Sequence, residues 1–249
     1  MNAHVSSMPG RPSPITSPTV IRVNNLHAFY GESHILHGVS FDVREREVVS
    51  LLGRNGGGRT TTIRSIMGLV DRMQGSIEIK GKQAIGMKPF RIARLGISYC
   101  PEERGIFGSL SCEENLLLPP RVSDQGMSLE QIYDIFPNLK TRRNAPGTKL
   151  SGGEQQMLAI ARILRTGAKI LLLDEISEGL APTIVDSLAE TIMKLRSLGY
   201  TIVMIEQNFE FAAPLADRFL VMERGRVVLE LDQTELAAKS ELINHYLGV

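Results

Sequence analysis

Hydrophobic residues follow two different periods in this chain. Val39, Phe41 and Val43 alternate with polar residues, as in a strand that buries one face. Other runs are apolar almost throughout, as in strands buried on both faces of a sheet. These apolar runs lie within residues 48–52, 169–175 and 200–207.

Segments with helical spacing separate these strands. After Gly58, apolar residues recur every three or four positions until Gly68, which predicts a helix that starts at a glycine-rich turn. Ser128 followed by Gln131 is the pattern of a capping box, and Pro137 ends the helix that it begins. Buried strands that alternate with helices predict an α/β fold around a mostly parallel sheet. We expect further helices over residues 152–167, 182–199 and 234–249.

Shorter strand patterns lie near both ends of the chain. Residues 20–43 are rich in them, residues 75–84 are typical of a strand pair, and residues 95–102 form one more expected strand. Near the C-terminus, the pattern of a hairpin turns at Arg224 and Gly225.

Composition limits the classes of protein that fit. With 249 residues, 43% of them hydrophobic, the chain can bury the core of one large domain or two small ones. A net charge of +1 gives no field that favours nucleic acid as the main partner. No apolar run reaches the roughly 18 to 20 residues that span a bilayer. The cysteines Cys100 and Cys112 fit free thiols in a reducing compartment better than a disulfide framework.

The N-terminal segment differs from the rest. Residues 1–19 contain Pro9, Pro12, Pro14 and Pro18 among serines and threonines, without the continuous apolar segment of a secretory signal. We expect a disordered tail there, with no function of its own.

The stretch GRNGGGRTT, residues 53–61, lies between an expected strand and an expected helix. It follows the phosphate-binding pattern G-x-x-x-x-G-K-[ST], except that Arg59 replaces the lysine. In such a loop, glycines let backbone N–H groups turn towards phosphate oxygens, and the helix dipole adds positive potential. Thr60 is placed to offer its hydroxyl to Mg²⁺. Without the lysine, a plain glycine-rich turn after a strand is the alternative.

A pair of acidic residues ends the apolar run at residues 169–175. Asp174 and Glu175 fit a carboxylate that holds a metal ion, followed by a base that orients water at a γ-phosphate. Acidic residues also follow strands for purely structural reasons. The acidic pair alone is therefore a weak sign of a metal site, and the glycine loop that precedes it in the chain makes the sign much stronger.

The pentapeptide LSGGE, Leu150 to Glu154, is the most specific motif. Ser151, two glycines and a helix start present backbone N–H donors, which makes a second anion site. Here the chain resembles the ATP-binding-cassette family, whose signature is this pentapeptide shortly before an acidic strand. The resemblance covers residues 20–249. It implies an α/β P-loop NTPase (RecA-like) fold with a mostly parallel sheet core, an antiparallel β subdomain and a small helical subdomain.

The resemblance also implies a division of the chain and a set of functional residues. The core and β subdomain correspond to residues 20–100 and 150–249, and the glutamine-loop region with the helical subdomain to residues 101–149. ATP and Mg²⁺ are the implied cofactors. Nucleotide-binding roles fall on Tyr30, Gly53, Arg54, Asn55, Gly56, Gly57, Gly58, Arg59, Thr60, Thr61, Ser151, Gly152, Gly153 and Glu154. Metal-binding roles fall on Thr60, Glu102 and Asp174, and catalytic roles on Glu175 and Gln207.

Several positions depart from the common family pattern. Glu102 stands where most members have glutamine, Gln207 where they have the switch histidine, and Ile176 where they have proline. Tyr30 matches the aromatic residue that stacks on adenine, and its neighbour Phe29 is expected in the core. Glutamine donates a hydrogen bond but carries no positive charge.

The motifs PEERGIF, SEGLAP and IEQN are together similar to the ATPase subunits of bacterial branched-chain amino-acid importers. Importers of urea or short-chain amides share much of this pattern and are an alternative. A soluble cassette protein of DNA repair or translation is a second alternative, although the chain has neither two cassettes nor a long coiled-coil insertion. A nucleotide-binding subunit with little hydrolysis is a third.

The resemblance further implies partners and a location. In the family, each ATP lies between the glycine loop of one subunit and the signature of the other, in a head-to-tail dimer. We expect a second, different ATP-binding subunit, two integral-membrane permease subunits and, indirectly, a periplasmic solute-binding protein, with no nucleic acid. The chain is then peripheral, at the cytoplasmic face of the inner membrane. Residues 107–110 are expected to receive a short permease helix, with ordinary core as the alternative.

Arg59 is the departure with the clearest chemical consequence. Arginine binds phosphate through a planar fork that fills more space than the lysine ammonium. We expect ATP binding to survive, helped by room at Gly57, and hydrolysis at this site to be slow. In a heterodimer, the intact signature at residues 151–154 would still complete the site of the partner.

Overall fold

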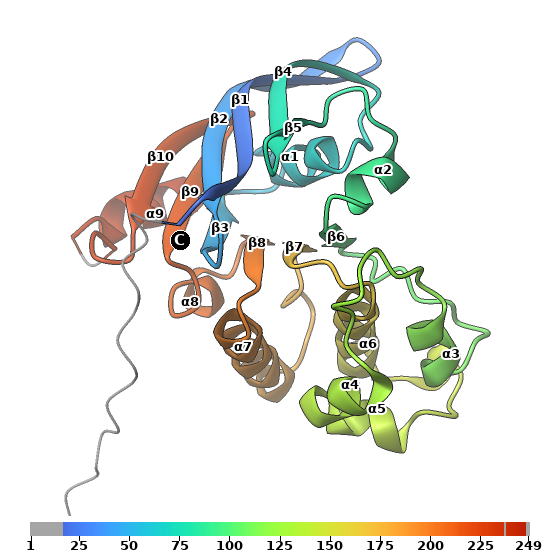
Figure 1. Cartoon of the computed structure of the whole chain (residues 1–249). Helices are drawn as coiled ribbons and strands as arrows, with labels where there is room; N and C mark the ends of the chain where they lie inside the picture. The colour runs from blue at the N-terminus through green and yellow to red at the C-terminus, as the bar shows by residue number, and fades with distance from the viewer. Residues whose placement is uncertain (1–16, 237, 248–249) are drawn as a thin grey trace, which may run out of the picture.

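The computed structural model describes residues 17–236 and 238–247, and its centre is a pair of β-sheets (Figure 1). Residues 1–16 of the expected tail lie outside this part. Thr19, the last residue of that tail, already pairs with Arg44, and the carbonyl oxygen of Pro18 accepts the N–H of Glu45. The first strand therefore begins one residue earlier than the sequence pattern indicated.

One sheet is antiparallel and has the strand order β2-β1-β4-β5. The strand β4 begins at Arg72, which pairs with Phe29 of β1, and so starts before the strand pair expected at residues 75–84. The bounds are Thr19–Tyr30 for β1, Ser33–Arg44 for β2, Arg72–Ile79 for β4 and Lys82–Gln83 for β5.

The other sheet has the order β10-β9-β3-β8-β7-β6, and all its pairs are parallel except β9 with β10. The hairpin turns at Arg224 and Gly225, as the sequence predicts; both have positive φ. The strands are Val48–Leu52 (β3), Ile97–Cys100 (β6), Ile170–Asp174 (β7), Thr201–Glu206 (β8), Arg218–Glu223 (β9) and Arg226–Asp232 (β10).

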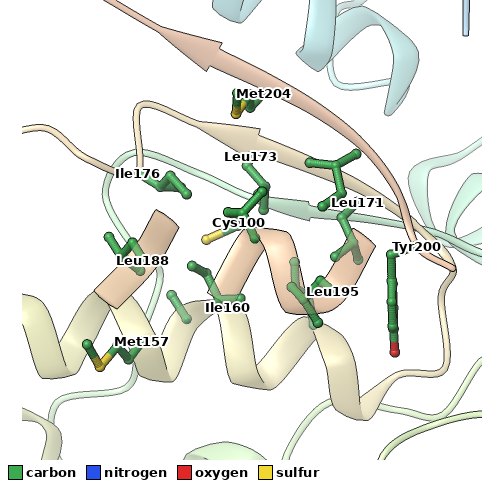
Figure 2. Packing of buried hydrophobic residues seen from close by; sticks show 14 of the residues in the cluster. Cys100, Met157, Ile160, Leu171, Leu173, Ile176, Leu188, Leu195, Tyr200 and Met204 are labelled. Carbon is green, nitrogen blue, oxygen red and sulfur yellow. The ribbon is translucent and has the colours of Figure 1, made fainter. Parts of the chain in front are cut away.

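Helices cover both faces of this parallel sheet (Figure 1). In β7, Ile170 and Leu172 belong to the core that contains α1 (Arg59–Ile66), whereas Leu171 and Leu173 belong to the core that contains α6 (Gly152–Arg165) and α7 (Pro182–Ser197). Figure 2 shows the second of these cores, where side chains of α6 and α7 pack beneath the strands. Side chains at the end of each strand therefore alternate between the α1 face and the α6–α7 face.

Residues 101–149 form a region of short helices beside α6 (Figure 1). The capping box of Ser128 and Gln131 is present at α4, as predicted, and Ser111 with Glu114 forms a second one at α3. Pro137 ends α4 and also begins α5. The elements are α3 (Cys112–Leu117), α4 (Leu129–Ile135), α5 (Pro137–Thr141) and the short helix Gly147–Lys149.

Three short helices complete the described part. Two were not predicted: α2 (Pro89–Ala93) and α8 (Phe209–Ala212). The C-terminal helix α9 (Ser240–Leu247) begins at Ser240, later than the expected residue 234. Before it, Oδ1 of Asp232 accepts the N–H groups of Thr234 and Glu235 in a turn. Within the described residues, no helix is both long and apolar enough to cross a bilayer.

Candidate nucleotide-binding site

The glycine loop, residues 53–58, connects β3 to α1. Gly53 and Gly58 have φ of +146° and +99°, which L side chains rarely adopt. A Cβ on Gly53 would lie 2.3 Å from the carbonyl oxygen of Met222, and one on Gly58 would lie 2.8 Å from Leu36. The packing of the loop against β9 and β2 therefore requires glycine, besides any need of a phosphate.

Gly57 lies against backbone of the loop and of β9. A Cβ there would meet the carbonyl oxygens of Arg54 and Met222, both at 3.0 Å, and Arg59 is not among the atoms nearest to it. The N–H of Gly57 donates to the carbonyl oxygen of Arg54. The atoms nearest to such a Cβ are thus backbone atoms of Arg54 and Met222.

Arg59 begins α1, is only 4% exposed, and contacts three partners. Its Nη1 donates to the carbonyl oxygen of Glu206 at 2.9 Å. Its Nη2 donates to Oδ1 of Asn55 at 3.1 Å and to Oε1 of Glu175 at 2.8 Å. Burial lowers the pKa of the guanidinium, while Glu175 and Asp174 raise it, and the group stays charged at neutral pH.

Glu175 follows β7 and carries the carboxylate that Arg59 contacts. Its φ is +47°, and its N–H donates to the carbonyl oxygen of Ile205 at 3.0 Å. Its Oε2 accepts a hydrogen bond from Nε2 of Gln207 at 3.0 Å. The structure therefore brings together both residues to which the resemblance gave catalytic roles, and a cation holds one of them.

Asp174 ends β7 with its side chain on the α1 face and is 1% exposed. It accepts hydrogen bonds from Oγ1 of Thr60 at 3.2 Å and from the hydroxyl of Tyr99 at 2.8 Å. Burial raises the pKa of Asp174, and these two hydrogen bonds act in the opposite direction. Thr60, Asp174 and Glu102 line one cavity of about 90 Å³. A hydroxyl and two carboxylates around a small cavity are the oxygen ligands that Mg²⁺ prefers.

A larger cleft of about 840 Å³ lies at the glycine loop. It is lined by residues of the loop, by residues 207–210 after β8, here called the switch segment, and by the end of α9. The lining residues are Gly53, Arg54, Asn55, Gln207, Asn208, Phe209, Glu210 and Leu247. The cleft therefore joins the loop that would bind phosphates to the switch residue Gln207.

The signature residues form the start of α6. Ser151 and Glu154 make a capping box, in which the N–H of Ser151 donates to Oε2 of Glu154 at 2.8 Å and the N–H of Glu154 donates to Oγ of Ser151 at 3.2 Å. Gly152 and Gly153 occupy the first turn, where helix N–H groups have no intrahelical acceptor. Residues 151–154 line neither of the two cavities. The two candidate phosphate sites are thus separate within the chain.

The remaining residues singled out in the sequence, Tyr30, Phe29 and Thr61, do not line either cavity. Tyr30, at the end of β1, is 43% exposed and lines neither cavity. We expected Phe29 in the core, but it is only half-buried. It stacks on His34 with 4.2 Å between ring centroids, and the guanidinium of Arg72 lies over it. Thr61 is buried within α1, where its carbonyl oxygen accepts the hydroxyl of Ser65.

Residues 107–110 lie at the surface of the short-helix region. Phe107 is 47% exposed, and the guanidinium of Arg162 lies 5.1 Å from the centre of its ring. Its backbone N–H donates to Oδ1 of Asn115 at 2.8 Å, which fixes the segment on α3. The side chain of Phe107 is therefore not part of the core.

Sequence reasoning missed three residues of the site. Tyr99 holds Asp174, and the pair of Ser177 and Glu206 joins the segment after β7 to the end of β8. The signal for Glu206 was present, because an acidic residue ends an otherwise apolar buried strand. Its partner Ser177 lies 29 residues earlier, so no local pattern identified it.

The glycine loop connects the buried strand β3 to the helix α1, and an acidic pair lies at the end of β7, which is separated from β3 by β8. This fold and this site define a P-loop nucleotide-binding protein. The ABC transporter family model matches residues 36–178. The chain belongs to the ABC transporter family and contains its ATPase domain.

Relatives match over nearly the whole chain. The high-affinity branched-chain amino acid transport ATP-binding protein BraG of Pseudomonas aeruginosa is 37% identical over 232 residues, which cover 92% of this chain and 100% of that protein. A probable branched-chain amino acid transport ATP-binding protein of Archaeoglobus fulgidus is 32% identical, with 92% and 99% covered. The lipopolysaccharide export system ATP-binding protein of Escherichia coli K12 is also 32% identical, with 92% and 97% covered.

Solved structures support the fold. An ATP-binding cassette of an ABC transporter in its ADP conformation matches with a TM-score of 0.75 at 22% identity, covering 94% of this chain and 100% of that one. A dimeric cassette bound to ADP and Pi matches with a TM-score of 0.75 at 23% identity, covering 86% and 98%. The predicted P-loop fold, with a mostly parallel core and an antiparallel subdomain, is confirmed.

Proposed function

We propose that this ABC ATPase subunit powers the import of branched-chain or related amino acids through separate permease subunits. Two of the similar proteins carry names of branched-chain amino acid transport, and the alignment with each spans nearly its full length. The glutamate at residue 102 and the glutamine at residue 207 agree with the pattern of that subgroup. A lipopolysaccharide export protein at 32% identity makes the solute the part of the proposal that most needs a test.

The chemistry that we propose is hydrolysis of ATP in the cleft at the glycine loop. The observation that carries it is the contact of Glu175 with Gln207, which lines that cleft, and with Arg59 at the start of α1. Glu175 would orient the attacking water, and Gln207 would donate a hydrogen bond there. Amides of residues 53–61 would bind phosphates, and Tyr30 would stack on adenine. Thr60, Asp174 and Glu102 would hold Mg²⁺, which neutralises phosphate charge when it is bound.

We also propose a head-to-tail dimer with a second, different ATP-binding subunit. The signature at residues 151–154 lines neither cavity near the glycine loop, and the first-turn amides of Gly152 and Gly153 face no partner within the helix. A second subunit would therefore complete each site. Such a dimer would lie at the cytoplasmic face of the membrane, with Phe107 against a helix of a permease.

Hydrolysis at the chain's own glycine loop is proposed to be slow. Arg59 spans Asn55, Glu175 and the carbonyl group of Glu206, so that the cation and the carboxylate of the site neutralise each other. ATP has to displace this pairing before Glu175 can orient water. Hydrolysis at this site would then limit the turnover of the whole complex.

The function is tested by uptake in the native host. Deletion of the gene should remove most high-affinity uptake of radiolabelled leucine, and the wild-type gene should restore it, whereas Glu175→Gln should not. Uptake of urea and export of lipopolysaccharide are measured in the same strains. Normal leucine uptake with loss of either of the other two activities would reject the import of branched-chain amino acids.

A further inference from the structure

Glu206 is a buried carboxyl group to which the proposed chemistry gives no role. It ends β8 and is 1% exposed. It lies in register with Leu52, the residue before the glycine loop. Because Ile202 and Met204 of the same strand lie in the α6–α7 core, alternation places the side chain of Glu206 on that face. A buried carboxyl group needs hydrogen-bond partners there.

The partner is the segment that follows Glu175. Oε2 of Glu206 accepts the hydroxyl of Ser177 at 2.6 Å, and Oε1 accepts the N–H of Ser177 at 3.3 Å. The N–H of Glu175 donates to the carbonyl oxygen of Ile205 at 3.0 Å. These three bonds fasten residues 175–177 to the end of β8. They hold Glu175 at a φ of +47°, which a non-glycine residue adopts only when its surroundings impose it.

The backbone of the same residue holds the cation. The carbonyl oxygen of Glu206 accepts Nη1 of Arg59 at 2.9 Å. The charged groups that face the carboxyl group are Glu175, which follows β7, and Arg59 on α1. Burial raises the pKa of Glu206 to about 7, while the hydrogen bonds from Ser177 and the charge of Arg59 act in the opposite direction. Glu206 thus contacts Arg59 directly through its carbonyl oxygen, and it contacts the segment that carries Glu175 through its carboxyl group.

We infer that Glu206 is a positioning residue of the ATPase site, whose carboxyl group sets the place of Glu175 through Ser177 and whose carbonyl group sets the place of Arg59. This inference rests on the proposed hydrolysis of ATP. Glu206 is 1% exposed and bonds to Ser177 and Arg59, so its effect on the reaction passes through the residues that it holds. A displacement of about 1 Å in a catalytic group costs about a hundredfold in rate. Loss of the carboxylate should therefore lower kcat and leave ATP binding nearly unchanged.

The experiment compares variants of the affinity-tagged transporter purified from its native host. Glu206→Gln keeps the size of the side chain but has one acceptor oxygen in place of two. Ser177→Ala removes the hydroxyl, and Ser177→Thr keeps it. The matched control is Glu47→Gln, since Glu47 is also a buried glutamate (6% exposed) but precedes β3 at the opposite end of the sheet and pairs with Arg218. For each variant, kcat, KM for ATP, binding of a fluorescent ATP analogue and Tm are measured.

We expect Glu206→Gln and Ser177→Ala each to lower kcat about tenfold or more, with KM within about threefold of the wild type. Ser177→Thr should keep most of the rate, and Glu47→Gln should keep kcat even where its Tm falls. The kcat of the double variant, Glu206→Gln with Ser177→Ala, should lie within about twofold of the kcat of the slower single variant. Both changes break the same hydrogen-bonded unit, so their effects should not add.

Two results would overturn the inference. The first is a normal kcat in Glu206→Gln in a complex that Glu175→Gln inactivates. The second is a fall in kcat that Glu47→Gln reproduces at equal loss of Tm. If the wild-type complex itself does not hydrolyse ATP, the proposed function fails, and the inference fails with it. That case is recognised in the wild type, before any variant is compared.

Discussion

Nη2 of Arg59 lies 2.8 Å from Oε1 of Glu175, and both side chains are at most 10% exposed. The residue that replaces the phosphate-binding lysine is thus paired with the carboxylate that would orient water. Removing one partner of a buried ion pair is costly, because the other charge is left without compensation. In the proposed function, an incoming ATP would therefore supply a phosphate oxygen to Arg59 in exchange for Glu175. This exchange leads to the first two predictions.

Arg59→Lys should raise ATP turnover of the purified transporter about tenfold. A lysine ammonium is compact and cannot contact Asn55, Glu175 and the carbonyl group of Glu206 together, so Glu175 is released more easily. Steady-state phosphate release at saturating ATP measures this effect. The control is Arg91→Lys, the same change at an exposed position of α2 that lines neither cavity. An unchanged rate, together with almost complete inactivation by Glu175→Gln, would show that the native site is fully competent.

Glu175→Gln should lower turnover by about a hundredfold or more, because an amide is a far weaker base for orienting water. Binding of ATP should become tighter at the same time, since Arg59 loses its anionic partner and is free for phosphate. Titration with a fluorescent ATP analogue measures the affinity. Glu178→Gln, at an exposed position three residues later, is the control. Weaker binding in Glu175→Gln would contradict the pairing of Arg59 with Glu175 as an obstacle to ATP.

Glu206 should make stability depend on pH. Its pKa is raised from 4.5 to about 7 in the folded chain, so the folded state holds a proton that the unfolded state releases in this range. Stability from this group is therefore present below about pH 4.5 and is lost as the pH rises to about 7. Across that window, Glu206→Gln should gain up to about 3 kcal/mol in unfolding free energy relative to the wild type.

Urea unfolding of the full chain at several pH values measures this difference between wild type and variant. The comparison uses buffers of constant ionic strength, so that screening of surface charges does not change with pH. A difference that stays constant from pH 5 to pH 8 would mean that Glu206 is ionised throughout and would contradict the prediction.

Phe107→Ala should weaken association with the permease subunits and leave ATP binding by the separate chain unchanged. The side chain is 47% exposed on the short-helix region and contributes little to the core, so its loss should hardly change Tm. Co-purification of permease with the tagged chain measures the association. Phe90→Ala is a matched control, because Phe90 is 52% exposed on α2. Equal loss of permease in both variants would argue against a specific docking role for Phe107.

The sequence by itself determined the features that local patterns encode. The strand periods, the glycine loop, the capping box at Ser128 and the order of strand, loop and helix all depend on neighbours a few residues away, and the structure contains them. Family membership followed from motifs of the same kind. The start of α9 at Ser240 escaped this reasoning. Asp232 and Glu235 make a local capping pattern that indicates an earlier helix start, but residues 233–236 form a turn.

Only the tertiary structure decided how the charged residues of the site are paired. Arg59 and Glu175 are 116 residues apart, and Ser177 and Glu206 are 29 apart, so their contacts exist only once β7, β8 and α1 are packed together. The parallel sheet brings the carboxyl ends of β3, β7 and β8 to one edge. Charged groups buried there are costly unless they are paired or hydrogen-bonded. The sequence located an altered cation at residue 59. The fold determined that its partner is the glutamate proposed to orient water.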